Sequence, residues 1–217
     1  MLAANADGEV ILLRASDGEC VVREAVLSNC SSILEGILRD GEKSDNKNES
    51  PRVIAMDDAD FPAVRAFLKV ATMLSHDSDE VIEMQQVALL VPMIMPLVHK
   101  WDARGMMNLS KAAVNASPDP EAAMAILTHD LESNGSTAWM HKEVKFKLIR
   151  HLCNDSYCVG TTAGVPLNYT PAEEKLALLP QRAAQELLQW TMTEAVYKVV
   201  DYKQNEVIRN NIHTYFL

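Results

Sequence analysis

Residues 10–38 read VILLRASDGECVVREAVLSNCSSILEGIL, and this stretch decides the fold. Two short apolar runs, Val10–Leu13 and Cys20–Val22, flank a Ser-Asp-Gly sequence at 16–18. An Asp-Gly turn between two such runs is a strong hairpin signal, because glycine accepts the positive φ that tight turns need. The sequence therefore predicts a β-hairpin at this point of the chain.

The segment after the hairpin has helical periodicity. Its apolar residues recur at the i, i+3, i+4 and i+7 spacing of one helical stripe, and polar residues fill the other face. The stripe consists of Val26, Leu27, Cys30, Ile33, Leu34, Ile37 and Leu38. We expect this stripe, including the Cys30 thiol, to pack into the core.

The rest of the chain predicts one more strand and several helices. Arg52–Met56 is a strand candidate, Phe61–Leu74 a helix, and Val81–Ala116 a helical region interrupted by Pro92 and Pro96. Further helices are expected at Glu121–Glu132, at Ala138–Leu152, after the capping signal Thr170–Glu173 with a break at Pro180, and at Glu194–Ile208. Loops are expected at Asp40–Ser50, Ser75–Glu80 and Asn154–Asn168. The predicted fold class is α+β: a small sheet of about three strands packed against a helical bundle, followed by an all-helical extension.

Charge and composition limit the function. The net charge is −10, and it divides into −11 for residues 1–132 and +1 for residues 133–217. An acidic surface does not displace the counterions of nucleic acid, so we expect no nucleic-acid partner. The division also suggests a boundary near residues 133–136, Ser-Asn-Gly-Ser.

Targeting signals give an expectation for localisation. The first ten residues, MLAANADGEV, lack the basic and apolar regions of a signal peptide. The longest apolar run, Val87–Val98, is shorter than the roughly 20 residues that a membrane helix needs. The four cysteines are interpreted as reduced thiols. We therefore expect a cytoplasmic or nuclear protein with no membrane partner.

The opening block resembles that of the BTB/POZ domain superfamily, which includes elongin C and the Skp adaptors. Residues that match the family pattern in order are Asp17, Gly18, Val22, Val26, Leu27, Ser31, Leu34, Ile37 and Leu38. Cys20 stands where the family often has Phe, and Arg23 stands where most members have His, which is closer to elongin C.

A second block lies about 60 residues downstream. Leu97–Met107 resembles the family's L-A-x-K-Y-D-x-x-x-L-L, with Lys100, Trp101 and Asp102 in the Lys-Tyr-Asp places. The segment before it departs from the family, because Val70–Leu74 replaces the usual aromatic I-Y-T-G-like sequence. The resemblance implies a BTB/POZ-like domain at residues 9–116 and a helical C-terminal extension at residues 117–217.

The resemblance implies a protein–protein interaction module and not an enzyme. Such domains commonly serve as adaptors or scaffolds for cullin-type ubiquitin ligases, or they self-associate. The hydrophobic-x-Glu element of many cullin-binding members is missing from Asp40–Ser50. Only about eight residues precede the hairpin, which disfavours the swapped dimer of the family, so we expect a monomer and not a dimer. A non-ligase scaffold or self-association protein is the alternative.

A metal- or ligand-binding protein is a further alternative. Its candidate residues are His141, His151, Cys153 and Cys158, whose spacing is wider than that of a zinc site. The sequence contains no esterase elbow, zinc-protease motif or phosphate-binding glycine loop, so we expect no cofactor and assign no catalytic or metal residues.

Three other groups of residues are interpreted as structural. Asp57, Asp58 and Asp60 are expected to cap a helix and not to bind a divalent ion. The basic residues are expected to form a solvated helix face, with docking of an acidic partner as the alternative: His141, Lys142, Lys145, Lys147 and Arg150. The methionines are expected to fill the core: Met93, Met95, Met106 and Met107.

Overall fold

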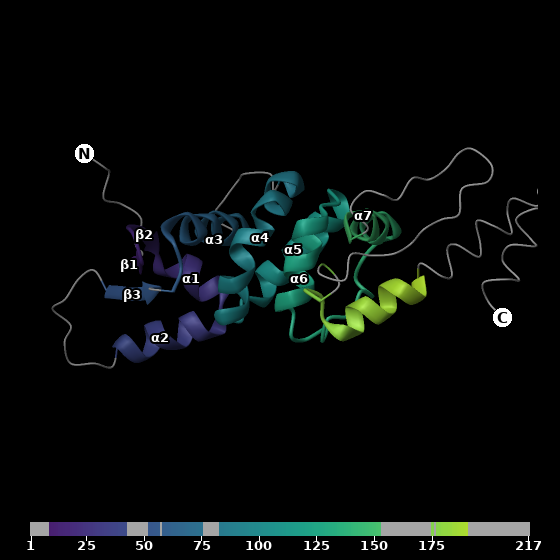
Figure 1. Ribbon diagram of the computed structural model, residues 1–217. Helices are drawn as coiled ribbons and strands as arrows, with labels where there is room; N and C mark the ends of the chain where they lie inside the picture. The colour runs from purple at the N-terminus through teal and green to yellow at the C-terminus, as the bar shows by residue number, and fades with distance from the viewer. Residues whose placement is uncertain are drawn as a thin grey trace, which may run out of the picture.

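The fold is α+β, as the sequence predicts: a three-stranded sheet at one end of an elongated body, with helices filling the rest (Figure 1). The computed structural model describes residues 9–42, 52–56, 58–75, 83–152, 175 and 177–190. The strands are β1 Val10–Ala15, β2 Glu19–Arg23 and β3 Arg52–Met56. The helices are α1 Glu24–Cys30, α2 Ser32–Glu42, α3 Phe61–Leu74, α4 Met84–Lys100, α5 Arg104–Ala116, α6 Pro120–His129 and α7 Lys142–Leu152, and residues 181–190 are also helical.

Most of the predicted elements that fall on described residues are present. The hairpin, the third strand and helices α3, α6 and α7 form where the sequence predicts them, within a few residues at their ends. The predicted break at Pro180 is present and residues 181–190 are helical, but residues 177–179 form a turn where the sequence predicts helix. The Thr170–Glu173 signal, the Glu194–Ile208 helix and the Asn154–Asn168 loop lie outside the described residues. Asp40–Glu42, predicted as loop, continue α2 instead.

The sheet has one buried and one exposed face. Its order is β2-β1-β3, with β1 antiparallel to β2 and parallel to β3. Alternate side chains enter the core, because successive residues of a strand point to opposite faces. Those on the inner face include Ile11, Leu13, Val22, Ile54 and Met56, all 9% exposed or less.

Gly18 is needed in the hairpin turn because Phe61 packs close to it, and not because of the positive φ that the sequence predicts. Its φ is not positive, so the expectation from turn geometry is wrong. A Cβ at this position would lie 2.8 Å from Cγ of Phe61, the first residue of α3. The turn is further tied to α3 because the Phe61 N–H donates to the Asp17 carboxylate at 2.6 Å. The close approach of α3 therefore requires glycine here.

The helical stripe after the hairpin is broken into two helices at Ser31. This residue is extended (φ −151°, ψ 125°) and 3% exposed, and its hydroxyl donates to the Trp101 carbonyl. The Leu34 N–H donates to the same hydroxyl at 3.1 Å, so Ser31 also caps α2. The change of direction leaves Ile33 and Ile37 more than 40% exposed, which corrects the prediction that the whole stripe is buried.

Helix α4 runs without interruption through Pro92 and Pro96, so the predicted break is wrong. Both proline rings lie on the exposed side of the helix. The opposite side holds seven buried residues, and this packing keeps the helix intact although each proline removes a backbone hydrogen bond. The helix ends instead at Lys100, and Asp102 takes the left-handed conformation at φ 45°.

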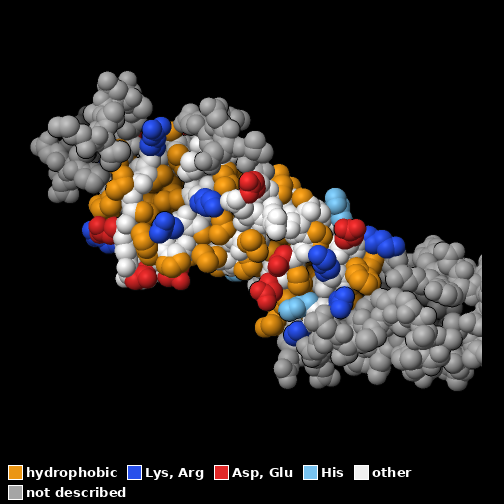
Figure 2. All heavy atoms as spheres, turned by 90° about the horizontal axis from the view of Figure 1, so that it is seen from above, with side chains coloured by type: hydrophobic (Ala, Val, Ile, Leu, Met, Phe, Trp, Pro, Cys, Tyr) orange, Lys and Arg blue, Asp and Glu red, His pale blue; other side chains and the backbone are white. Residues whose placement is uncertain are grey.

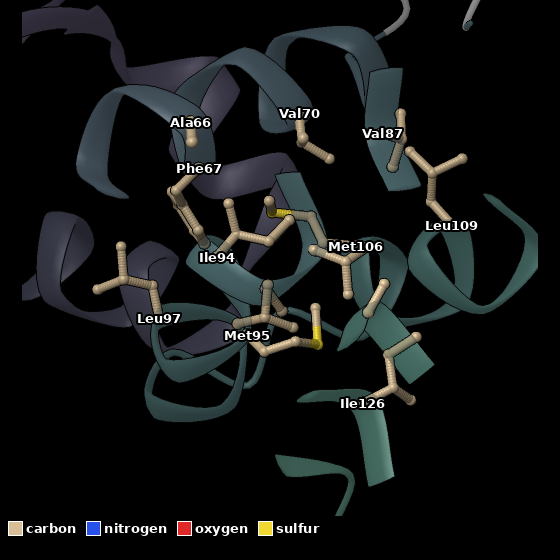
Figure 3. Close-up of a cluster of buried hydrophobic side chains, with 14 of the residues drawn as sticks. Ala66, Phe67, Val70, Val87, Ile94, Met95, Leu97, Met106, Leu109 and Ile126 are labelled. Atoms are coloured by element: carbon tan, nitrogen blue, oxygen red, sulfur yellow. The ribbon is translucent and has the colours of Figure 1, made fainter. Parts of the chain in front are cut away.

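One hydrophobic core extends from the sheet to the last described helix. Figure 3 shows its centre, where side chains of α3, α4, α5 and α6 point toward one another; the labelled ones include Phe67, Ile94, Met106 and Ile126. Helix α6 packs against both α4 and α5. The residues after 116 therefore share the core of those before it, and the division into two domains stays a prediction.

Glu186 fixes the helix at residues 181–190 to the turn before α7. Its carboxylate accepts from the N–H of Thr137 at 2.6 Å, from the Thr137 and Ser136 hydroxyls, and from Arg182. Burial by itself would raise the pKa of Glu186, but these donors outweigh it and lower the pKa to about 2.

We expect Ser31→Ala to destabilise the protein by about 2–4 kcal/mol, because it removes a helix cap and leaves the buried Trp101 carbonyl without its donor. Urea unfolding followed by circular dichroism measures the change. The matched control is Ser32→Ala, since Ser32 is exposed, and its effect should stay within about 0.5 kcal/mol. Equal effects of the two substitutions would contradict the role assigned to Ser31.

We expect Glu186→Gln to lower the melting temperature at pH 7 and to lose this effect in acid. A carboxylate whose pKa is depressed in the folded state stabilises above its unfolded pKa of 4.5, and that stability is lost as the pH falls toward about 2. Thermal unfolding of both proteins between pH 7 and pH 2 measures the convergence. Glu132→Gln is the control, because its pairing with Arg104 is exposed. A difference that does not vary with pH would contradict the assignment.

Candidate docking groove

Helix α4 exposes a stripe of apolar residues opposite its buried face. We name Leu89, Pro92, Met93 and Pro96 the α4 stripe; all four are exposed, and they follow the i, i+3, i+4 and i+7 spacing of one helix face. Leu89 is 67% exposed and Met93 is 44% exposed. Contiguous exposed apolar residues are typical of sites where other molecules bind.

Met93 and Pro96, the C-terminal part of the α4 stripe, border a groove between α4 and the start of α3, which we name the α3–α4 groove. It has a volume of about 580 Å³. Its apolar lining comes from both sides: Ala59, Ala63, Met93, Pro96 and Leu97. The polar lining residues are Ser16, Asp58, Asp60 and Lys100. An apolar depression with a few polar groups is the usual form of a binding site.

Two hydrogen bonds position the α3 side of this groove. Asp60 begins α3 by accepting from the Ala63 N–H at 2.8 Å, and Ser16 in the hairpin turn donates to the Ala59 carbonyl at 3.0 Å through its hydroxyl. The segment before α3 is thereby held against the sheet. Hydrogen bonds to the backbone therefore hold Ala59 and the first turn of α3, which line this side of the groove.

An ion pair closes the polar end of the groove. The Lys100 ammonium lies 2.5 Å from the Asp58 carboxylate and 5.0 Å from the centre of the Trp101 ring. The hydrogen bond from Lys100 lowers the pKa of Asp58. Lys100 and Trp101 belong to the second family-like block, and Ser31 of the first block donates to the Trp101 carbonyl. The two blocks thus meet beside the groove.

Figure 2 shows hydrophobic side chains spread over the half of the molecule that holds the sheet, with several Lys and Arg side chains among them. Other exposed apolar residues lie elsewhere on the same half. Ile33 and Ile37 project from α2, and Val10, Val21 and Val53 from the outer face of the sheet. The α4 stripe differs from these because it continues into a groove.

The two described aspartates near α3 have separate roles. Asp60 caps the helix, as the sequence predicts. Asp58 pairs with Lys100 instead of capping, and Asp57 lies outside the described residues.

The residues proposed for a metal or ligand site are only partly described. His141 is exposed at the start of α7, and its N–H donates to the Asn115 side chain at 2.8 Å. His151 lies at the end of α7, ten residues further on, whereas Cys153 and Cys158 lie outside the described residues. In the described part of the chain, no three histidine, cysteine or acidic side chains are grouped to hold a metal ion.

The remaining sequence candidates have structural positions. Met95 and Met106 are fully buried, as expected, but Met93 is exposed on the α4 stripe. Burial raises the pKa of the Cys30 thiol to about 12, which fits its expected place in the core. The basic residues of α7 lie on its outer side, opposite Val144, Leu148 and Ile149, and Lys147 donates to the Pro118 carbonyl.

Sequence reasoning missed the α3–α4 groove. It treated Pro92 and Pro96 as helix breaks and Met93 as core. The signal that could have found the α4 stripe is its own spacing, because Leu89, Pro92, Met93 and Pro96 form a second apolar stripe on one helix.

A scan of the chain against protein-family models finds no match, and a search of curated proteins finds none either. Among the described helices, none is both long and apolar enough to cross a membrane.

We expect Leu89→Lys and Met93→Lys to leave the free energy of unfolding within about 0.5 kcal/mol of the wild type, because both side chains are already solvated. Ile94→Ala, on the buried face of the same helix, should cost about 2–4 kcal/mol. Urea unfolding measures all three. A large loss in either lysine variant would mean that the α4 stripe is part of the core.

Proposed function

We propose that this chain is a protein–protein interaction module of the BTB/POZ type and not an enzyme. The α3–α4 groove and the α4 stripe form its docking site. The observation that carries the proposal is an apolar face left exposed on a helix whose other face is fully packed. A partner protein that covers this face removes apolar surface from water, which favours binding.

The groove favours a partner segment with apolar anchors. Met93 and Pro96 form one wall and Ala59 and Ala63 the other, so small and medium apolar side chains fit between them. A helix that places such side chains on one face matches this kind of site. The net charge of −10 attracts partners with basic residues around those anchors.

The resemblance to BTB/POZ domains makes a cullin-type ubiquitin ligase the first partner to test. Two sequence blocks carry the resemblance, and the Ser31–Trp101 contact joins them in space, although the hydrophobic-x-Glu element of many cullin-binding members is missing from Asp40–Ser50. In this role the chain is an adaptor between a ligase and its substrate, in the cytoplasm or nucleus. The alternative is a scaffold that binds another protein through the same groove.

The test is capture of recombinant cullins by the immobilised full-length chain at micromolar concentration. We expect the wild type to retain a cullin and the double variant Leu89→Lys/Met93→Lys to weaken binding roughly tenfold or more, because apolar contacts at the centre of an interface dominate its affinity. The double variant Ile33→Lys/Ile37→Lys is the matched control, because it adds the same two charges at exposed apolar residues of α2.

Three results are distinguishable. Binding that is lost only in the α4 stripe variant supports the ligase adaptor and its site. Binding that survives in that variant rejects the groove as the site. No retention of any cullin rejects the adaptor role and leaves the scaffold, for which the same variants test any partner found later.

A further inference from the structure

Strand β2 is an edge strand of the described sheet, and its free backbone groups can be identified. The Glu24 N–H donates to the Glu9 carbonyl and the Ala15 N–H donates to the Gly18 carbonyl. In an antiparallel pair, the residues that bond to the neighbouring strand alternate along the chain. Even-numbered residues of β2 therefore bond to β1, and residues 19, 21 and 23 direct their N–H and carbonyl groups outward.

The same three residues carry a symmetric set of side chains on the outer face of the sheet. Glu19, Val21 and Arg23 are exposed, with an acid at one end, a base at the other and an apolar residue between them. If two β2 strands lie antiparallel around a two-fold axis at Val21, each Glu19 faces the partner's Arg23. The strand is thus complementary in charge to itself.

We propose that a second copy of this chain pairs with the first through β2, forming one continuous six-stranded sheet across the two-fold axis. The two Val21 residues each donate to and accept from the other. Each Arg23 N–H donates to the carbonyl of the partner's Glu19. The Arg23 carbonyl takes no part, because Arg23 is the N-cap of α1 and its carbonyl belongs to the first turn of that helix.

The pairing also extends an apolar row on the outer face. The register places Leu12 of β1 between Val21 of β2 and Val53 of β3. Val21 is the last apolar residue of this row at the β2 edge, and it is 64% exposed. Val53, at the β3 edge, is 47% exposed. Opposing Val21 with the partner's Val21 makes the row continuous across both sheets, and such cross-strand apolar pairs stabilise a sheet.

The charges on β2 favour a second copy over an unrelated peptide. Arg23 is exposed and forms no ion pair with any residue that the structure describes, so its charge is available. Glu19 is paired with Arg14 at 2.7 Å but remains about half exposed. This proposal departs from the sequence expectation of a monomer. That expectation rests on the short segment ahead of the hairpin, and β2 pairing does not use that segment. No residue that lines the α3–α4 groove lies on β2, so the two sites can be tested separately.

Analytical ultracentrifugation of the full chain between 1 and about 200 μM tests the proposal at the micromolar affinity typical of small interfaces. We expect a concentration-dependent species of twice the 24.1 kDa chain mass. Arg23→Glu places like charges opposite each other twice per dimer and should raise the dissociation constant roughly tenfold or more. Glu19→Arg should do the same, and the double variant Glu19→Arg/Arg23→Glu should restore association. The control is Arg39→Glu, which makes an equal charge change at an exposed position of α2.

Oxidative cross-linking tests the register. In a Cys20→Ser background, Val21→Cys should form an intermolecular disulfide, because opposing hydrogen-bonded residues have Cα atoms roughly 5.5 Å apart, within disulfide range. Val53→Cys on the opposite edge strand should not. Circular dichroism of each variant checks that it is folded. A monomer throughout the concentration range, association that ignores the charge variants, or cross-linking at Val53→Cys in place of Val21→Cys would each overturn the proposal.

Discussion

The contact between Ser31 and the Trp101 carbonyl is the constraint on which the rest of the structure depends. It joins residues 70 positions apart, and both partners are almost fully buried. At Ser31 the chain leaves α1 and enters α2, and at Trp101 it leaves α4 and approaches α5. One hydroxyl therefore fixes two changes of chain direction, the one between α1 and α2 and the one between α4 and α5.

The elements with strong local signals could be predicted from the sequence. The hairpin, β3 and α3 have clear periodicity, and Asp60 caps α3 as its position before an apolar stripe indicates. The division of the first helical segment at Ser31 could not be predicted, because the serine fits either inside or between helices. Its structural role requires the Trp101 carbonyl, which local sequence does not place beside it.

The same limit explains why the α3–α4 groove was missed. Local rules penalise Pro92 and Pro96 inside a helix by several kcal/mol in total. Packing of Val91, Ile94 and Val98 on the other face outweighs that cost, but it depends on α3, α5 and α6. Once α4 is continuous, its prolines and Met93 must face outward, and the α4 stripe follows. For Gly18, local reasoning named the right residue for the wrong cause, since the neighbour that requires it is Phe61 from a distant helix.

If a partner binds the α3–α4 groove as proposed, the position of α4 has a consequence for the lifetime of the protein in the cell. This helix carries one wall of the groove and also packs against α3, α5 and α6, so the groove forms only when α4 is packed in place. A partner that binds the folded groove, and not the unfolded chain, stabilises the entire fold by RT ln(1 + [L]/Kd). Proteolysis draws on the unfolded population. Occupancy of the groove would thus set how much of the chain accumulates, which makes its abundance a reporter of its partner's concentration.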